Sequence, residues 1–180
     1  MLAKTEEDFR LTVLNPGGRD PQQQFHRVPG PDEGRHAPIN FHAFAACTLG
    51  AFHRDTRCAV AEGTSVLLLL RSDFRASERA LSDLKKHGRT VAVSLKETGL
   101  HQIAQQLRDP GKLSRLIKIV READGCIATT PEAADIYQRI GTHDRPAFID
   151  ASTTTEQAIA VATVNAIHLI CWRSSRLPAR

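Results

Sequence analysis

The sequence predicts a three-layer α/β domain with a mainly parallel sheet of about five strands. Apolar segments of strand length alternate along the chain with segments of helical periodicity, which is typical of parallel sheets with right-handed crossovers. The segment Ser65 to Leu70 is apolar at five consecutive positions after its serine, as expected of a strand covered by helices on both faces. A chain of 180 residues is long enough to bury one core of its own.

The first elements are a short strand, a glycine break and a long helix. Residues 9–14 are predicted as the strand, and residues 15–18, Asn-Pro-Gly-Gly, follow it. Glycines there let the backbone turn and let a ligand approach closely, although a simple turn after a strand has the same composition. Residues 15–40 show no periodicity and are predicted as a long loop. A helical period from Phe41 then predicts a helix to about Ala61 that ends at Gly63.

The second half continues the alternation. Ala76 to Leu84 has a helical period, and Gly88 suits the C-terminal cap of that helix. The remaining predicted elements are, in order, a strand at Thr90–Leu95, helices near 100–107 and 113–120, a strand at 125–129, a helix opened by Thr130-Pro131, a strand at 146–149 and a last helix at 157–172. Thr153 and Glu156 have the spacing of a capping box for the last helix.

The composition excludes several classes of protein. The formal net charge is +4 and aromatic residues make up 5% of the chain, so stacking platforms for bases are not evident and nucleic-acid binding is not expected. The first twelve residues contain several charged side chains, so no signal peptide is expected. The apolar stretch from Ala158 to Trp172 contains Thr163, Asn165 and His168, and it is too short and too polar for a membrane span. A cytoplasmic protein is expected.

The four cysteines lie far apart, with no C-x-x-C motif. Cys47, Cys126 and Cys171 have apolar neighbours in the sequence and are predicted to be small buried thiols in a reducing compartment. Cys58 completes the set.

Polar residues that could carry chemistry follow three predicted strands at their carboxyl ends, where ligands bind in this architecture. The third group also opens a helix, whose N-terminal amides can hold an anion. The three groups are Asn15, Gly17 and Gly18 after the first strand, Lys96 and Glu97 with His101 after the third, and Thr130 and Glu132 after the fourth.

Glu97 and His101 are four residues apart and could share one helix face. A histidine there can act as a general base, and Lys96 beside them can bind a phosphate or carboxylate. The alternative is that Lys96 and Glu97 are solvated residues at a helix start.

Asn40 and His42 open the first long helix. Their amide and imidazole groups suit a sugar hydroxyl or a phosphate, but Asn40 could equally be the N-terminal cap. The other histidines show no H-E-x-x-H spacing, so no metal site and no metal cofactor are expected. No G-x-S-x-G motif supports a serine hydrolase.

Four runs together resemble the N-terminal half of a bacterial glycosyltransferase of the GT-B architecture. They are Pro38–Thr48 (PINFHAFAACT), Val66–Arg71 (VLLLLR), Val91–His101 (VAVSLKETGLH) and Ala123–Glu132 (ADGCIATTPE). The resemblance covers about residues 9–150. It implies a Rossmann-like N-terminal domain that contacts the acceptor sugar, a second domain that binds the nucleotide sugar, and transfer in the cleft between them without a bound metal.

The resemblance assigns expected roles to the candidates. Asn15, Gly17 and Gly18 would line the floor of the cleft, Asn40 and His42 would contact the acceptor, and Glu97 or His101 would deprotonate it. The chain departs from the family after Asp150, where residues 151–180 form an apolar helix and a basic tail instead of a second domain. We therefore expect a truncated or split enzyme without transfer activity of its own.

Two other interpretations stay open. The chain could be a non-catalytic α/β module that binds a small phosphorylated ligand or a protein partner. A flavodoxin-like or response-regulator fold has less support, because the acidic residues that response regulators need are missing. The last helix is apolar nearly all round, so one side is expected on the sheet and the other in a homodimer or against a partner chain through residues 156–172.

Overall fold

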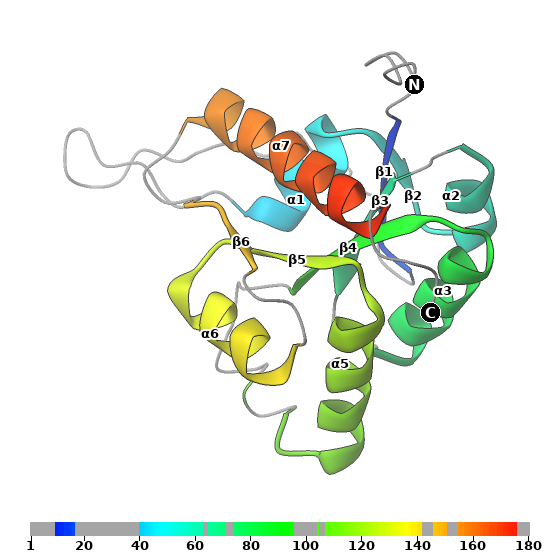
Figure 1. Ribbon diagram of the computed structural model, residues 1–180, viewed down its shortest axis with the longest axis vertical. Helices are drawn as coiled ribbons and strands as arrows, with labels where there is room; N and C mark the ends of the chain where they lie inside the picture. Colours follow the sequence, from blue (N-terminus) through cyan, green and yellow to red (C-terminus); the bar gives the residue numbers. More distant parts are fainter. Residues whose placement is uncertain are drawn as a thin grey trace.

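The computed structural model describes residues 10–16, 40–62, 65–70, 74–95, 104, 107–141, 146–150 and 155–175. These residues form a six-stranded, all-parallel sheet in the order β2-β1-β3-β4-β5-β6, with helices on both faces (Figure 1). The strands are β1 (Leu11–Leu14), β2 (Ala51–His53), β3 (Ser65–Leu70), β4 (Thr90–Leu95), β5 (Gly125–Ala128) and β6 (Ala147–Phe148). The predicted three-layer, Rossmann-like α/β fold is confirmed, with one strand more than expected.

The helices form two layers. They are α1 (Phe41–Thr48), α2 (Thr56–Glu62), α3 (Phe74–Lys86), α5 (Pro110–Glu122), α6 (Pro131–Ile140) and α7 (Glu156–Ser174). Helices α1 and α7 share a buried core cluster with one face of the sheet, and we call them the α1/α7 layer. Helices α2, α3, α5 and α6 share the core cluster of the other face and form the α3/α5 layer. Figure 1 shows α7 and α1 above the sheet and α3, α5 and α6 below it.

Strand β3 lies at the centre of the sheet and is buried along its whole length. Its side chains alternate between the two faces. Leu67 belongs to the core under the α1/α7 layer, Leu68 belongs to the core under the α3/α5 layer, and both have no exposed surface. The prediction of a strand covered on both faces is confirmed.

The predicted helix from Phe41 to about Ala61 is wrong, because the structure divides it into α1, β2 and α2. Gly50 lies at the break, where a Cβ atom would overlap the backbone carbonyl oxygen of Leu11. The chain can therefore come directly against β1 at this point, and Ala51 to His53 pair with Thr12 to Leu14. Tertiary pairing with β1 overrides the helical period of the sequence.

The predicted ends of helices are confirmed in part. Gly88 has a φ of 69°, the left-handed conformation expected after α3. Thr130 caps α6, since its Oγ1 accepts a hydrogen bond from the backbone N of Ala133 at 3.2 Å. The predicted cap of α7 is wrong: Thr155, not Thr153, accepts from the backbone N of Ala158. Most of the predicted helix near 100–107 lies outside the described residues.

The cysteines divide differently from the prediction. Cys126 is buried, and burial raises the pKa of its thiol to about 12. Cys47 is exposed, because Phe44 and Ala45 are the residues that α1 turns toward the sheet. Cys171 is half-buried, with its Sγ 3.1 Å from Oγ of Ser65. Cys58 is exposed.

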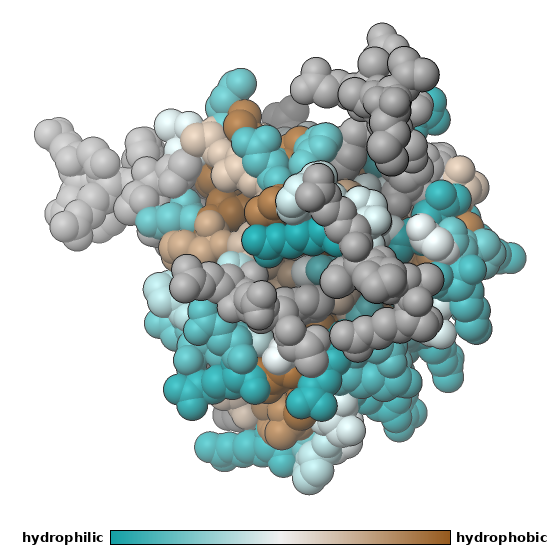
Figure 2. Space-filling view, viewed as in Figure 1, coloured by the Kyte–Doolittle hydropathy of each residue, from teal (hydrophilic) through white to brown (hydrophobic). Residues whose placement is uncertain are grey.

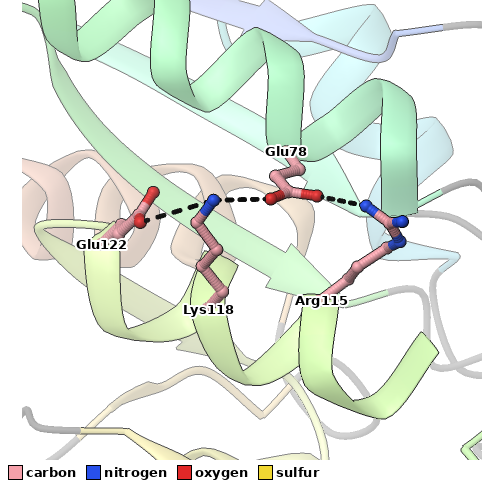
Figure 3. A network of polar contacts seen from close by, with 4 residues as sticks. All are labelled: Glu78, Arg115, Lys118 and Glu122. Carbon is pink, nitrogen blue, oxygen red and sulfur yellow. Dashed lines mark hydrogen bonds and ion pairs between the residues drawn. The ribbon is translucent and has the colours of Figure 1, made fainter. Parts of the chain in front are cut away.

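Ion pairs join helices of the α3/α5 layer. Glu78 of α3 accepts a hydrogen bond from Nη1 of Arg115 and another from Nζ of Lys118, both at 2.7 Å, and Lys118 also lies 4.0 Å from Glu122 (Figure 3). The bonds from Lys118 and Arg115 lower the pKa of Glu78. The carboxylate therefore links α3 to α5 at ordinary pH.

The order β2-β1-β3-β4-β5 is the order of flavodoxin-like domains. The acidic residues of response regulators belong to one functional class with this topology, so their absence from the sequence does not exclude this path of the chain. In this order the chain leaves β1 toward β2 and then returns to β3 on the other side of β1. No helix among the described residues is long and apolar enough to span a membrane.

Candidate functional site

The carboxyl edge of β1 and β3 is where ligands are expected, because the strand order reverses between these two strands. Asn15 directly follows β1, and Ser94 lies one residue before the end of β4. Register places Leu69 of β3 beside Ser94 and Leu68 beside Leu14. Asn15, Leu69 and Ser94 therefore occupy one row across three neighbouring strands, about 4.8 Å apart from strand to strand.

Asn15 is 6% exposed, and its backbone N donates to the carbonyl oxygen of His53 at 3.0 Å. This bond extends the pairing of β1 with β2 past the end of the strand. The side-chain Oδ1 of Asn15 is buried and has no hydrogen-bond partner among the described groups. A buried acceptor without a partner costs about 1–3 kcal/mol, so a ligand or water that donates to this oxygen would be favoured.

Ser94 is fully buried, and its Oγ also has no hydrogen-bond partner in the part of the chain that the structure describes. It lies two residues after Ala92, which contributes to the core under the α1/α7 layer. Strand alternation therefore places the hydroxyl on the same face of the sheet as α1. Ser94 was not among the predicted site residues, although a polar side chain in an otherwise apolar strand, Val91 to Leu95, was a signal for it.

His42 joins the first turn of α1 to the end of β4. Its Nε2 lies 3.0 Å from the backbone carbonyl oxygen of Ser94. A carbonyl oxygen only accepts hydrogen bonds, so Nε2 carries a proton and donates. In the neutral ring Nδ1 is then the basic nitrogen. His42 is 8% exposed, so the ring is fixed at the edge of the sheet.

Asn40 caps α1, because its Oδ1 accepts a hydrogen bond from the backbone N of Ala43 at 3.3 Å. The capping interpretation of Asn40 is therefore confirmed. The predicted contact of Asn40 with an acceptor stays a prediction.

Thr130 and Glu132 lie at the carboxyl end of β5, where α6 begins. Helix α6 belongs to the α3/α5 layer, so these residues share the edge with Asn15 and Ser94 but lie on the other side of the sheet. Glu132 is exposed. The end of β4 is also bonded to α6, because Leu95 donates its backbone N–H to the hydroxyl of buried Tyr137.

The other candidates lie outside the described residues, and their roles stay predictions. They are Gly17, Gly18, Lys96, Glu97 and His101. The structure thus brings Asn15, His42 and Ser94 to one edge of the sheet, whereas Thr130 and Glu132 lie at the start of α6, a helix of the α3/α5 layer.

The described part of the site offers polar groups: a carboxamide oxygen, a hydroxyl and an imidazole. Such groups suit a ligand rich in hydroxyls. No cluster of three or more His, Cys, Asp or Glu side chains that could hold a metal occurs within the described ranges.

Comparison with protein-family models, with curated proteins and with solved structures found no match to this chain.

Proposed function

We propose that this chain is the acceptor-side domain of a GT-B type glycosyltransferase and that it binds a hydroxyl-rich ligand at the carboxyl edge of β1 and β4. The observation that carries the proposal is the buried Oδ1 of Asn15, which lacks a hydrogen-bond partner among the described groups at the point where the strand order reverses. The hydroxyl of Ser94 adds a second such group in the same row. Two different hydroxyls of one sugar can serve these groups: one can donate to the Asn15 oxygen, and the other can pair with the Ser94 hydroxyl in either direction.

The sequence supports the same proposal independently. The resemblance of Ala123–Glu132 and the other runs to GT-B enzymes concerns the half that contacts the acceptor. In that family a second domain binds the nucleotide sugar, so the proposal for this chain is binding of an acceptor. Transfer would require a donor-binding domain, and Glu97 or His101 would serve as the base for the acceptor hydroxyl.

A thermal-shift panel of acceptor sugars and nucleotide sugars tests the proposal. A ligand at one hundred times its Kd stabilises the fold by about 2.7 kcal/mol. We expect a shift with at least one acceptor sugar, and the loss of that shift in Asn15→Ala and in Ser94→Ala. Ser82→Ala is the matched control, because Ser82 is exposed on α3 in the other layer. A shift that survives both site substitutions would contradict the proposed site.

The same panel can distinguish two roles of Asn40, capping of α1 and contact with the ligand. Asn40→Ser keeps an oxygen that can cap α1 but removes the amide, whereas Asn40→Ala loses both. If Asn40 contacts the acceptor, Asn40→Ser binds more weakly at unchanged stability of the free protein. If Asn40 only caps, Asn40→Ser binds like the parent protein.

A second function is favoured by a different observation. The outer side of α7 exposes Val161, Leu169 and Trp172, which is typical of a surface for protein association. An interaction module without ligand binding would give no shift with any sugar in the panel.

A further inference from the structure

We propose that the outer side of α7 forms a homodimer contact in which α7 packs antiparallel against α7 of a second copy. The contact lies away from the carboxyl edge and does not depend on ligand binding there. It rests on the exposure, the rigidity, the lack of charge and the order of the side chains along this helix.

The large apolar side chains that are exposed among the described residues concentrate on α7. Val161 is 52% exposed, Leu169 47% and Trp172 51%, while a fourth, Phe148, lies on β6. Figure 2 shows brown atoms among teal and white ones in the region of α7, whereas the surface over α5 is mostly teal. The opposite side of α7 is buried on the sheet through Ile159, Thr163, Ile167 and Ile170.

Helix α7 is fixed on the sheet by contacts of its buried side with β5 and β3. A Cβ atom at Gly125 would lie 2.5 Å from Cδ1 of Ile170, so α7 lies directly on the backbone of β5 at this point. Sγ of Cys171 is 3.1 Å from Oγ of Ser65 on β3. The exposed side chains are therefore presented on a fixed helix and need little ordering on association.

The same helix carries no Asp, Glu, Lys or Arg from Gln157 to Trp172. Two copies of a chain with a formal net charge of +4 can meet through this surface without placing like charges opposite each other. The helices of the α3/α5 layer, in contrast, carry charged residues along their exposed sides. On this uncharged helix, self-association thus meets little electrostatic opposition.

The order of side chains on α7 is complementary to itself. Val161, Asn165, His168 and Trp172 follow one another at intervals of four, three and four residues, which is the spacing of a two-helix seam. In an antiparallel pair centred between residues 166 and 167, Val161 faces Trp172 of the second copy. Asn165 then faces His168 of the second copy, and an amide and an imidazole can share a hydrogen bond. Polar pairs in such a seam fix its register.

The proposed contact is short. From Val161 to Trp172 the helix is about 16 Å long, and a contact of this length buries less than the roughly 800 Å² per partner of a standard interface. We therefore expect a weak, reversible dimer.

Sedimentation equilibrium of the full chain over a range of concentrations tests the proposal. We expect a monomer–dimer equilibrium that Val161→Lys and Trp172→Glu each weaken about tenfold or more. The double variant should regain dimerisation, because each introduced cation then faces an introduced anion across the two-fold axis. Ser114→Lys on α5 is the matched control for added charge, since Ser114 is exposed in the other layer, and it should dimerise like the parent.

Three results would overturn the proposal. They are a parent chain that stays monomeric up to about 1 mM, a dimer that both single substitutions leave intact, and a double variant that dimerises no better than the single ones. Circular dichroism of each variant checks the fold, and Val161→Gln or Trp172→Gln replaces a charged variant that does not fold, with weaker dimerisation still expected.

Discussion

The two helix layers cover the same parallel sheet but present different surfaces. The α3/α5 layer is charged on its outer side and joins its helices by ion pairs such as Glu78 with Arg115 and Lys118. In the α1/α7 layer, residues 41–48 and 157–172 contain no Asp, Glu, Lys or Arg. The buried polar groups of Asn15 and Ser94 also face that layer. The charged layer is suited to contact with water, whereas the uncharged layer is where we propose a ligand at its edge and a second copy on α7.

The largest expected effect on the free energy of unfolding comes from substitutions that test whether the two layers are packed equally well. Leu67 and Leu68 are both fully buried on β3 and face opposite layers. Replacing either with Ala removes buried methyl groups and leaves a cavity, so we expect each to cost about 2–5 kcal/mol in the free energy of urea unfolding. If Leu67→Ala cost under about 1 kcal/mol, the α1/α7 layer would be loosely packed, contrary to the structure.

The next effect concerns how α7 is attached to the sheet. Gly125→Ala places a methyl group against the side chain of Ile170, and the overpacking should cost about 1–3 kcal/mol. In an Ile170→Ala background the same substitution has room, so its cost should fall by at least half. Unfolding measurements on the two single variants and the double variant give this coupling. Independent, additive costs would show that α7 does not lie on Gly125.

A smaller effect is expected in the charged layer. Glu78→Gln removes two ion pairs at a partly exposed site and should cost less than about 1 kcal/mol at neutral pH. Hydrogen bonds from Lys118 and Arg115 lower the pKa of Glu78 below its ordinary value of 4.5. The stabilisation is therefore present above pH 4.5 and is lost as the pH falls through the lowered pKa of the folded state.

Unfolding curves of the parent and of Glu78→Gln should accordingly converge below pH 4.5. Glu122→Gln is the control, because its carboxylate lies 4.0 Å from Lys118 and is 44% exposed. A difference between Glu78→Gln and the parent that stays constant down to low pH would mean that the ion pairs are not its cause.

The smallest effect on the free energy of unfolding is expected at the proposed ligand site, in the protein without ligand. Ser94→Ala removes a buried hydroxyl that has no hydrogen-bond partner among the described groups, so the free energy of unfolding should stay within about 0.5 kcal/mol or rise. Chemical denaturation without ligand measures it. A loss of more than about 1 kcal/mol would show that the hydroxyl is already bonded in the free protein, for example to a buried water.

The sequence was sufficient for the fold class and for most elements. Apolar runs such as Ser65 to Leu70 are specified locally, and so is the cap at Thr130. The predicted helix from Phe41 to about Ala61 is wrong because the strand at Ala51 to His53 forms by pairing with β1. A helical period in the sequence carries no information about such a partner.

The site was predictable in part. The rule that ligands bind at carboxyl ends of strands selected Asn15, and the start of a helix selected His42. Ser94 was missed although its polar side chain in an apolar strand was a local signal. Its place in the candidate site depends on two facts that no local pattern contains: the register with Leu69 and the bond from His42 to its carbonyl. Thr130 and Glu132 lie apart from the other candidates because α6 packs in the α3/α5 layer. The local sequence does not show which layer a helix joins.

The most direct test of the difference between the layers uses Trp172, the single tryptophan of the chain. In the single chain Trp172 is half exposed on α7. In the proposed dimer it packs against Val161 of the second copy. As the protein concentration rises, we predict that its fluorescence moves to shorter wavelength and that acrylamide quenches it less, with neither change in Val161→Lys. Emission and quenching that stay the same at every concentration would contradict the account.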